Sequence, residues 1–239
     1  MRSILFVVAL VMIQSVAAWN WDAHEAMVMS VYYRLDPALR EHLSVERLAE
    51  GSIMPDKVFR DYQKHGFPRS LPEAERWLQS THSFLAQEDY SNASLSFGIA
   101  SHYLTDSFSA PHSISGEPYS LHQLYEDQAS QAYDYAECPL NSFALAEAIM
   151  TGTEQGKTWG SWVATRDAAL PRHAVHDATL SLTTVASDVF NSTCTSFETT
   201  IRKVDSSFTP QLYLGMGIVL LCVVGVGAWL YRDLEQYRK

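Results

Sequence analysis

The sequence predicts an all-α protein, with one multi-helix domain built around a metal cluster and one C-terminal transmembrane helix. Strand-like alternation of apolar and polar residues is scarce, whereas several stretches repeat apolar residues at i, i+3, i+4 and i+7. Near the C-terminus a long stretch contains no charged residue, which is typical of a membrane-spanning helix.

Residues 1–18 have the composition of a secretory signal peptide. Arg2 precedes an apolar run, and the small residues Ala17 and Ala18 complete a cleavage signal. Cleavage after Ala18 would make Trp19 the first residue of the mature chain. An uncleaved membrane anchor is the alternative, although the apolar run is short for crossing a bilayer.

Residues 212–231 read LYLGMGIVLLCVVGVGAWLY and are expected to form the transmembrane helix. Tyr213 and Trp229 lie near its ends, as aromatic residues do at membrane interfaces. Arg232 and further basic residues follow, so we expect the tail, 232–239, in the cytoplasm and the preceding domain outside the cell membrane. A buried core helix is the alternative, and it would need further chain to cover it.

Between these segments, residues 19–208 are enough for one domain of about 190 residues with a full core. The first expected helix carries Met27, Val28 and Val31 on one face. Gly51 ends the second. In chain order, the expected helices are 22–35, 37–50, 73–87, 94–108, 119–136, 143–153 and 174–189.

The formal net charge of −10 is spread along the chain without a block, which argues against a nucleic-acid-binding groove. Cys138 and Cys194 lie on the oxidising side of the expected membrane and could form a disulfide, while Cys222 lies within the span. The cysteine spacings match no zinc finger or redox motif.

Two histidine–carboxylate pairs have helical spacing. His102 and Asp106 are four residues apart, as are His122 and Glu126, so each pair would project from one helix face. His112 lies between them. A single such pair is more often a surface hydrogen bond, but two pairs within 25 residues favour ligands for divalent metal ions.

Trp19 and His24 add an unusual feature near the start of the mature chain. A freed amino group and the carbonyl oxygen of Trp19 can chelate a metal in a five-membered ring. Together with GSIMPD, which ends at Asp56, THSF around His82 and the two pairs, the pattern resembles the zinc-dependent phospholipase C family. The fungal single-strand-specific zinc nucleases are a related pattern. The resemblance covers about 19–126.

The resemblance implies a cluster of up to three zinc ions. The expected ligands are Asp56, His82 and His102 for the first zinc, His112, His122 and Glu126 for the second, and the Trp19 amino and carbonyl groups with His24 for the third, with Asp106 bridging the first and third. Two-histidine-plus-carboxylate sites also accept manganese and other divalent ions.

Such a cluster would hydrolyse phosphodiesters. Asp56 is the first candidate for the catalytic base, and Asp22 the second, with a helix N-cap as the alternative role of Asp22. The surroundings of Asp56 and the final Glu126 resemble the phospholipase branch. His24, only five residues after Trp19, resembles the nuclease branch.

Three functions follow as expectations. The first is a phospholipase C-like hydrolase acting on phospholipid or another phosphodiester. The second is a single-strand nuclease or nucleotidase, for which Trp77, Trp159 and Trp162 could stack on bases, although core packing is their commoner use. The third is a non-catalytic, metal-stabilised membrane-anchored module. An oxygen-rich ligand set without cysteine favours catalysis over a structural site.

Four histidines match no role in this pattern, namely His42, His65, His173 and His176. His65 lies near Asp56 in sequence. We expect it to be a solvent-exposed loop residue, with contact to substrate as the alternative.

Overall fold

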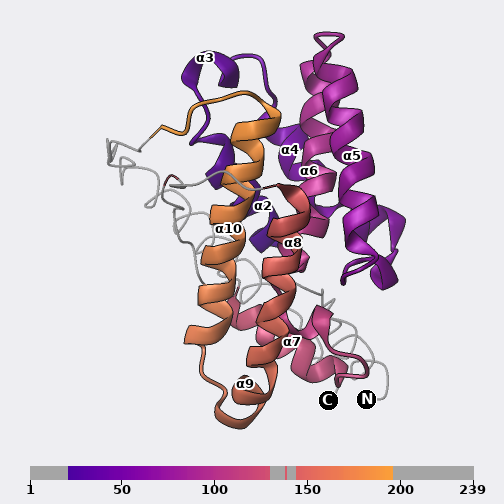
Figure 1. The fold of residues 1–239 in the computed structure, drawn as a ribbon, viewed down its shortest axis with the longest axis vertical. Helices are drawn as coiled ribbons and strands as arrows, with labels where there is room; N and C mark the ends of the chain where they lie inside the picture. Colours follow the sequence, from indigo (N-terminus) through magenta and orange to yellow (C-terminus); the bar gives the residue numbers. More distant parts are fainter. Residues whose placement is uncertain (1–20, 130–137, 139–143, 196–239) are drawn as a thin grey trace, which may run out of the picture. The chain divides into compact units, whose positions relative to one another are not determined.

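The computed structural model describes residues 21–129, 138 and 144–195, which are helical and contain no strand (Figure 1). All of them belong to one compact unit. The predicted signal peptide, Trp19, the transmembrane segment 212–231 and the tail 232–239 lie outside this part. Within the described residues, no helix has the length and apolarity needed to cross a membrane.

Nine α-helices and four short helical turns make up the described part of the chain. In chain order they are α2 (Trp21–Tyr32), α3 (Pro37–Arg40), α4 (Val45–Met54), η2 (Pro55–Phe59), η3 (Tyr62–Lys64), α5 (Ser70–Leu85), α6 (Tyr90–Asp106), η4 (Ala110–Ser113), α7 (Tyr119–Ala129), α8 (Leu145–Thr153), η5 (Glu154–Thr158), α9 (Trp159–Thr165) and α10 (Ala169–Val189). The prediction of an all-helical domain is confirmed.

Helix α6 is the centre of the arrangement, since it packs against α2, α4, α5, α8 and α10. Its residues are buried from Ser96 to Asp106, which an amphipathic surface helix would not allow. Side chains such as Phe97 and Leu104 join the main core together with Leu182 of α10. A central helix of this kind fixes the positions of any polar groups that it carries.

Helices α4 and α6 cross at two glycines. A Cβ atom on Gly51 would collide with the Leu95 carbonyl, and one on Gly98 would collide with the Leu48 carbonyl. Only glycine lets the two backbones approach so closely. The close crossing brings the end of α4 beside the second half of α6, where His102 and Asp106 lie.

Several element boundaries differ from the prediction. The expected helix 37–50 is split into α3 and α4, because the Ser44 side chain accepts a hydrogen bond from the Arg47 backbone N–H and starts a new helix. Helix α9 was not predicted. Helix α10 begins at Ala169, five residues earlier than expected, because Pro171 is tolerated in its first turn.

The disulfide that the sequence left open is present between Cys138 and Cys194. The chain after α10 is also held by hydrogen bonds, since the Thr195 N–H donates to the Arg34 carbonyl over 2.8 Å. The Asp36 N–H donates to the Ser192 hydroxyl over 2.8 Å. These contacts fasten the end of the domain to the connection between α2 and α3.

Candidate metal centre

The carboxylate of Asp106 lies at the centre of a histidine cluster. Asp106 is 1% exposed. Its Oδ1 lies 3.2 Å from His24 Nε2 and 3.6 Å from His112 Nε2. Its Oδ2 lies 2.8 Å from His65 Nδ1 and 3.1 Å from His102 Nε2. One carboxylate therefore faces four imidazoles, two on each oxygen, which suits a group that bridges two metal ions.

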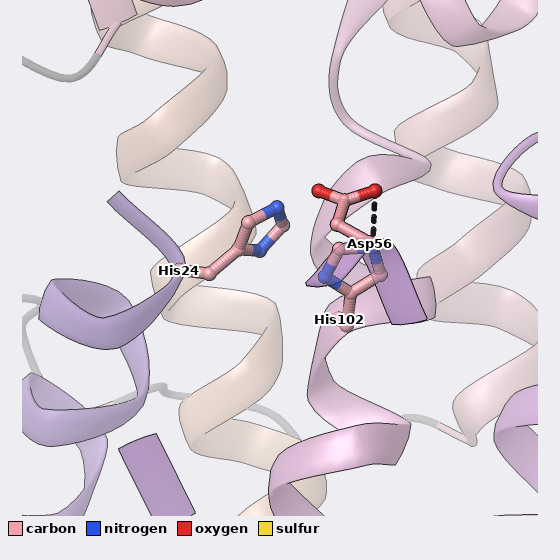
Figure 2. Close-up of side chains that lie close together, drawn as sticks. All are labelled: His24, Asp56 and His102. Carbon is pink, nitrogen blue, oxygen red and sulfur yellow. Dashed lines mark ion pairs between the residues drawn. The ribbon is translucent and has the colours of Figure 1, made fainter. Parts of the chain in front are cut away.

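Asp56 faces the same cluster from η2. Its Oδ1 lies 3.7 Å from His65 Nδ1 and 3.9 Å from His102 Nε2. Figure 2 shows Asp56, His24 and His102 turned toward one another from three different elements. One ligand atom of each of these three lies within 4.8 Å of the other two, a spacing that a metal ion could span.

A second group of ligands adjoins the first. His122 Nε2 lies 2.8 Å and His112 Nε2 lies 3.3 Å from Glu126 Oε1. The Ser109 hydroxyl donates to the same oxygen over 3.2 Å. His112 also belongs to a third group, with His65 and Asp106. The three potential metal sites are thus neighbours in one buried cluster.

The local sequence explains how these side chains meet. On α6 and α7, a spacing of four residues places each histidine one turn from its carboxylate, as expected. Pro111 starts the short turn η4, which redirects the chain and presents His112 between the two pairs. Asp56 comes from η2, directly after α4, and His24 comes from α2.

Hydrogen bonds fix the orientation of His102 and His24. His102 Nδ1 donates to the Ser52 carbonyl over 2.7 Å, which leaves Nε2 facing the carboxylates. His24 Nδ1 lies 3.0 Å from the Thr105 hydroxyl, which donates to the Ser101 carbonyl. The Thr105 oxygen therefore accepts from His24, and His24 Nε2 faces Asp106. In metalloproteins, such outer contacts orient the ligand histidines.

Carboxylates orient His122 and His65 in the same way. His122 Nδ1 donates to Glu117 Oε1 over 3.0 Å. His65 Nε2 lies 3.4 Å from Asp61 Oδ1, while the Tyr103 hydroxyl donates to Asp61 Oδ2 over 2.9 Å. Glu117 and Asp61 were not among the predicted site residues. Their roles depend on contacts that spacing along one helix does not reveal.

Charge interactions within the cluster shift the acid–base equilibria. Burial opposes protonation of His102, but Asp106 and Asp56 outweigh it and raise the His102 pKa to about 9. Burial likewise opposes the charge on Glu126, but hydrogen bonds from His112 and His122 lower its pKa to about 2. His122 responds to Glu126 and Glu117, which overcome burial and raise its pKa to about 9. Without metal, protonated histidines balance the negative charge of the buried carboxylates.

The donor set fits zinc. Both Asp106 oxygens are buried and accept no hydrogen bond of normal geometry, although histidine nitrogens lie within ion-pair distance. Imidazole nitrogens and carboxylate oxygens are normal zinc ligands, and a cationic metal ion would satisfy Asp106 more directly than shared protons do. His24, Asp56, His65, His102, Asp106, His112, His122 and Glu126 would hold such ions.

The structure places one predicted ligand away from the cluster. His82 is exposed on the last turn of α5 and belongs to none of the candidate metal groups among the described residues. His65, expected in solvent, is 2% exposed and takes the place beside Asp56 and Asp106. The chain after η2 turns back toward α6, which the helical periodicity around His82 does not indicate. The one signal in the sequence that could have identified His65 is its position nine residues after Asp56.

Two other predicted residues have different outcomes. Asp22 is exposed in the first turn of α2, where a carboxylate is favoured by the helix dipole. Trp19 lies outside the described residues, so its amino and carbonyl groups remain a prediction.

Comparison with known proteins gives one match. The family model for zinc-dependent phospholipase C matches residues 23–176, which include every candidate ligand from His24 to Glu126. No curated protein and no solved structure matches the chain.

Proposed function

Because the chain belongs to the zinc-dependent phospholipase C family, we propose that it hydrolyses the phosphodiester bond of a phospholipid and releases diacylglycerol. The observation that carries this proposal is the position of Asp106 between four histidines, beside a second His112–His122–Glu126 group. A cluster of this kind offers adjacent sites for divalent ions, and phosphodiester hydrolysis commonly uses such sites.

Zinc bound to these residues would supply positive charge for the phosphate oxygens and lower the pKa of an attacking water. The protein's own residues supply orientation and a base. The Ser52 carbonyl and the Thr105 hydroxyl hold His102 and His24 with Nε2 toward the cluster. Asp56 is buried at the edge of the cluster and is the first candidate to accept a proton from water. Asp22, two residues before His24, is the second.

The nuclease alternative loses part of its support. Trp159 and Trp162 are buried together against Tyr125, so they pack in a small core and are not available for stacking on bases. Trp77 is partly buried and stacks against Phe59. Single-strand binding needs exposed aromatic side chains in a basic groove. A phospholipid is therefore the favoured substrate.

We further propose that the domain faces the outside of a membrane to which residues 212–231 anchor it. The Cys138–Cys194 disulfide supports an oxidising compartment, since such bonds seldom persist in the cytosol. The charge pattern around 212–231 supports the orientation. A tethered enzyme would meet lipid head groups at high effective concentration. Protease accessibility of the domain on intact cells tests this orientation, and protection from added protease would refute it.

Substrate choice is tested with the purified full chain loaded with zinc. It is given phosphatidylcholine in mixed micelles and, separately, single-stranded DNA, each with and without a chelator. Chelator-sensitive diacylglycerol release supports the proposal, whereas cleavage of DNA alone would assign the nuclease activity. In the same assay, Asp22→Asn should lower turnover with unchanged zinc content. Unchanged turnover would limit Asp22 to a role in the helix.

A further inference from the structure

The connection between α4 and α5 exposes an unusual number of apolar side chains. Among the described residues, eight large hydrophobic side chains are exposed, and four of them lie within residues 58–67. They are Val58, Phe59, Tyr62 and Phe67, with Val58 58% exposed. Exposed apolar side chains gathered in this way commonly mark an interaction surface.

The same connection is basic although the whole chain is acidic. Lys57, Arg60 and Arg69 are exposed, and Asp61 is the only acidic residue in the sequence 57–69. The Asp61 carboxylate is turned inward, toward the Tyr103 hydroxyl and His65. The formal net charge of the chain is −10, so this segment opposes the overall charge. It would therefore attract an anionic surface that the rest of the protein repels.

Packing on the inner side holds these side chains outward. Gly66 lies so close to the His112 carbonyl that a Cβ atom would collide with it. Phe59 stacks on Trp77 with ring centres 5.8 Å apart, and Arg76 lies over the same indole. The segment is therefore fixed against η4 and α5, while Val58 and Phe67 stay exposed.

The segment also belongs to the metal centre. Asp56 precedes it, and His65 within it contacts Asp106. Tyr62 lies over this end of the site, because its hydroxyl is 3.4 Å from the Asp56 carbonyl and its ring centre is 6.0 Å from that of His65. Any surface that meets Val58 and Phe67 is thus brought next to the candidate catalytic cluster.

We propose that residues 57–69 dock onto the surface of a lipid bilayer that contains anionic phospholipids, with Val58, Phe59 and Phe67 entering the interface. Aromatic and aliphatic side chains next to Lys and Arg are the combination that binds such interfaces. This inference rests on the proposed function, because docking would serve to deliver a lipid head group to the site. The binding itself can be measured separately.

A second copy of the chain is the competing occupant of this surface. In a two-fold dimer the same patch meets itself, so Lys57, Arg60 and Arg69 of one copy would face the same residues of the other. Like charges opposed across an interface disfavour association. An anionic bilayer has the complementary charge, which is why the membrane is the occupant that we favour.

The test uses the full chain with Cys222→Ser, reconstituted in nanodiscs of phosphatidylcholine with about one-third phosphatidylserine. An environment-sensitive fluorophore is attached at Val58→Cys or, as control, at Met150→Cys on α8. The two positions are 58% and 56% exposed, so they differ mainly in location. Nitroxide-labelled lipids should quench the fluorophore at position 58 and leave the one at position 150 unaffected.

Charge dependence is tested with Arg60→Gln and Arg69→Gln, and with Arg172→Gln on α10 as control. Each change in the segment should weaken docking about fivefold, and the control should not. Equal quenching at positions 58 and 150, or docking unaffected by the two arginine changes, would overturn the proposal. Shielding of position 58 without lipid quenching, accompanied by dimer formation, would assign the surface to a second copy.

The fluorescence measures docking independently of substrate turnover. The test therefore separates the docking proposal from the proposed function. A chain that docks and releases no diacylglycerol would refute only the proposed function. One that releases diacylglycerol without docking would refute only this inference.

Discussion

Nδ1 of His65 lies 2.8 Å from Oδ2 of Asp106, although the two residues are 41 positions apart in the sequence. The contact joins the connection after α4 to the central helix α6. It places a histidine from an irregular segment beside a carboxylate that is also near three other histidines. The metal centre therefore forms only where these two distant segments meet.

His65→Ala is expected to lower zinc content and phospholipid hydrolysis, whereas His82→Ala should change neither. The reason is that His65 is buried against Asp106 while His82 is exposed on α5. Removing a ligand should reduce activity by more than the roughly 10- to 100-fold typical of changes in outer contacts. Metal analysis and diacylglycerol release measure both effects. Loss of zinc in His82→Ala, with His65→Ala unaffected, would restore the sequence-based ligand set.

Glu117→Gln should weaken zinc binding at the His112–His122–Glu126 group by about 10- to 100-fold. The Glu117 carboxylate accepts the His122 Nδ1–H over 3.0 Å and so keeps Nε2 directed at Glu126. Competition with a zinc-binding dye would measure the affinity. Glu75→Gln, at an exposed position on α5, is the matched control. Equal affinities for both variants would mean that Glu117 does not position His122.

Gly98→Ala is expected to destabilise the domain by about 1–3 kcal/mol, because a methyl group there would collide with the Leu48 carbonyl at the α4–α6 crossing. Gly160→Ala on α9 meets no atom within 4 Å and should be neutral or slightly stabilising. Chemical denaturation of the two metal-free variants compares their free energies of unfolding. Similar stability of the two variants would show that the crossing tolerates a side chain.

The metal-free chain should lose stability as the pH rises from 6.5 through about 9. Burial opposes the charge on His102 and His122, but neighbouring carboxylates raise both pKa values from 6.5 to about 9. A raised folded-state pKa stabilises the fold fully below the unfolded value, and this contribution disappears above the folded value. The pKa of His24 is lowered by burial and by His102, so His24 opposes this trend only below pH 6.5.

Zinc should reverse this dependence, because metal binding requires unprotonated histidines. The comparison is made by measuring the melting temperature across this pH range, once with chelator and once with zinc. His122→Gln provides an internal control, since the chelated variant should lose less stability than the parent chain. A melting temperature of the chelated parent that stays level or increases toward pH 9 would contradict the pKa shifts.

Local spacing was sufficient to predict one part of the site. His102 with Asp106, and His122 with Glu126, are each one turn apart on a single helix, so their proximity follows from helical geometry alone. The all-helical class could be predicted from the helical periodicity of the apolar residues, which is likewise a local property of the sequence. Gly51, predicted as a helix end, lies inside α4, and its contact with Leu95 becomes visible only once α4 and α6 are placed together.

The choice between His65 and His82 could not be made in this way. His82 stands in a regular helix near apolar residues, whereas His65 follows a turn in which Arg60 adopts a left-handed conformation. The path of such a connection depends on packing against η4 and α6, which no short-range pattern encodes. Glu117 and Asp61 were missed for a related reason, since their function is to contact histidines that other parts of the fold bring into position.

The most direct test of the central claim is the zinc content of the purified full chain, compared with that of Asp106→Asn and each measured alongside chelator-sensitive diacylglycerol release. The account predicts up to three zinc ions in the parent chain, and both zinc content and activity sharply reduced in the variant, because Asp106 faces four of the candidate ligands. A parent chain that binds no zinc, or an Asp106→Asn variant with full zinc content and activity, would contradict it.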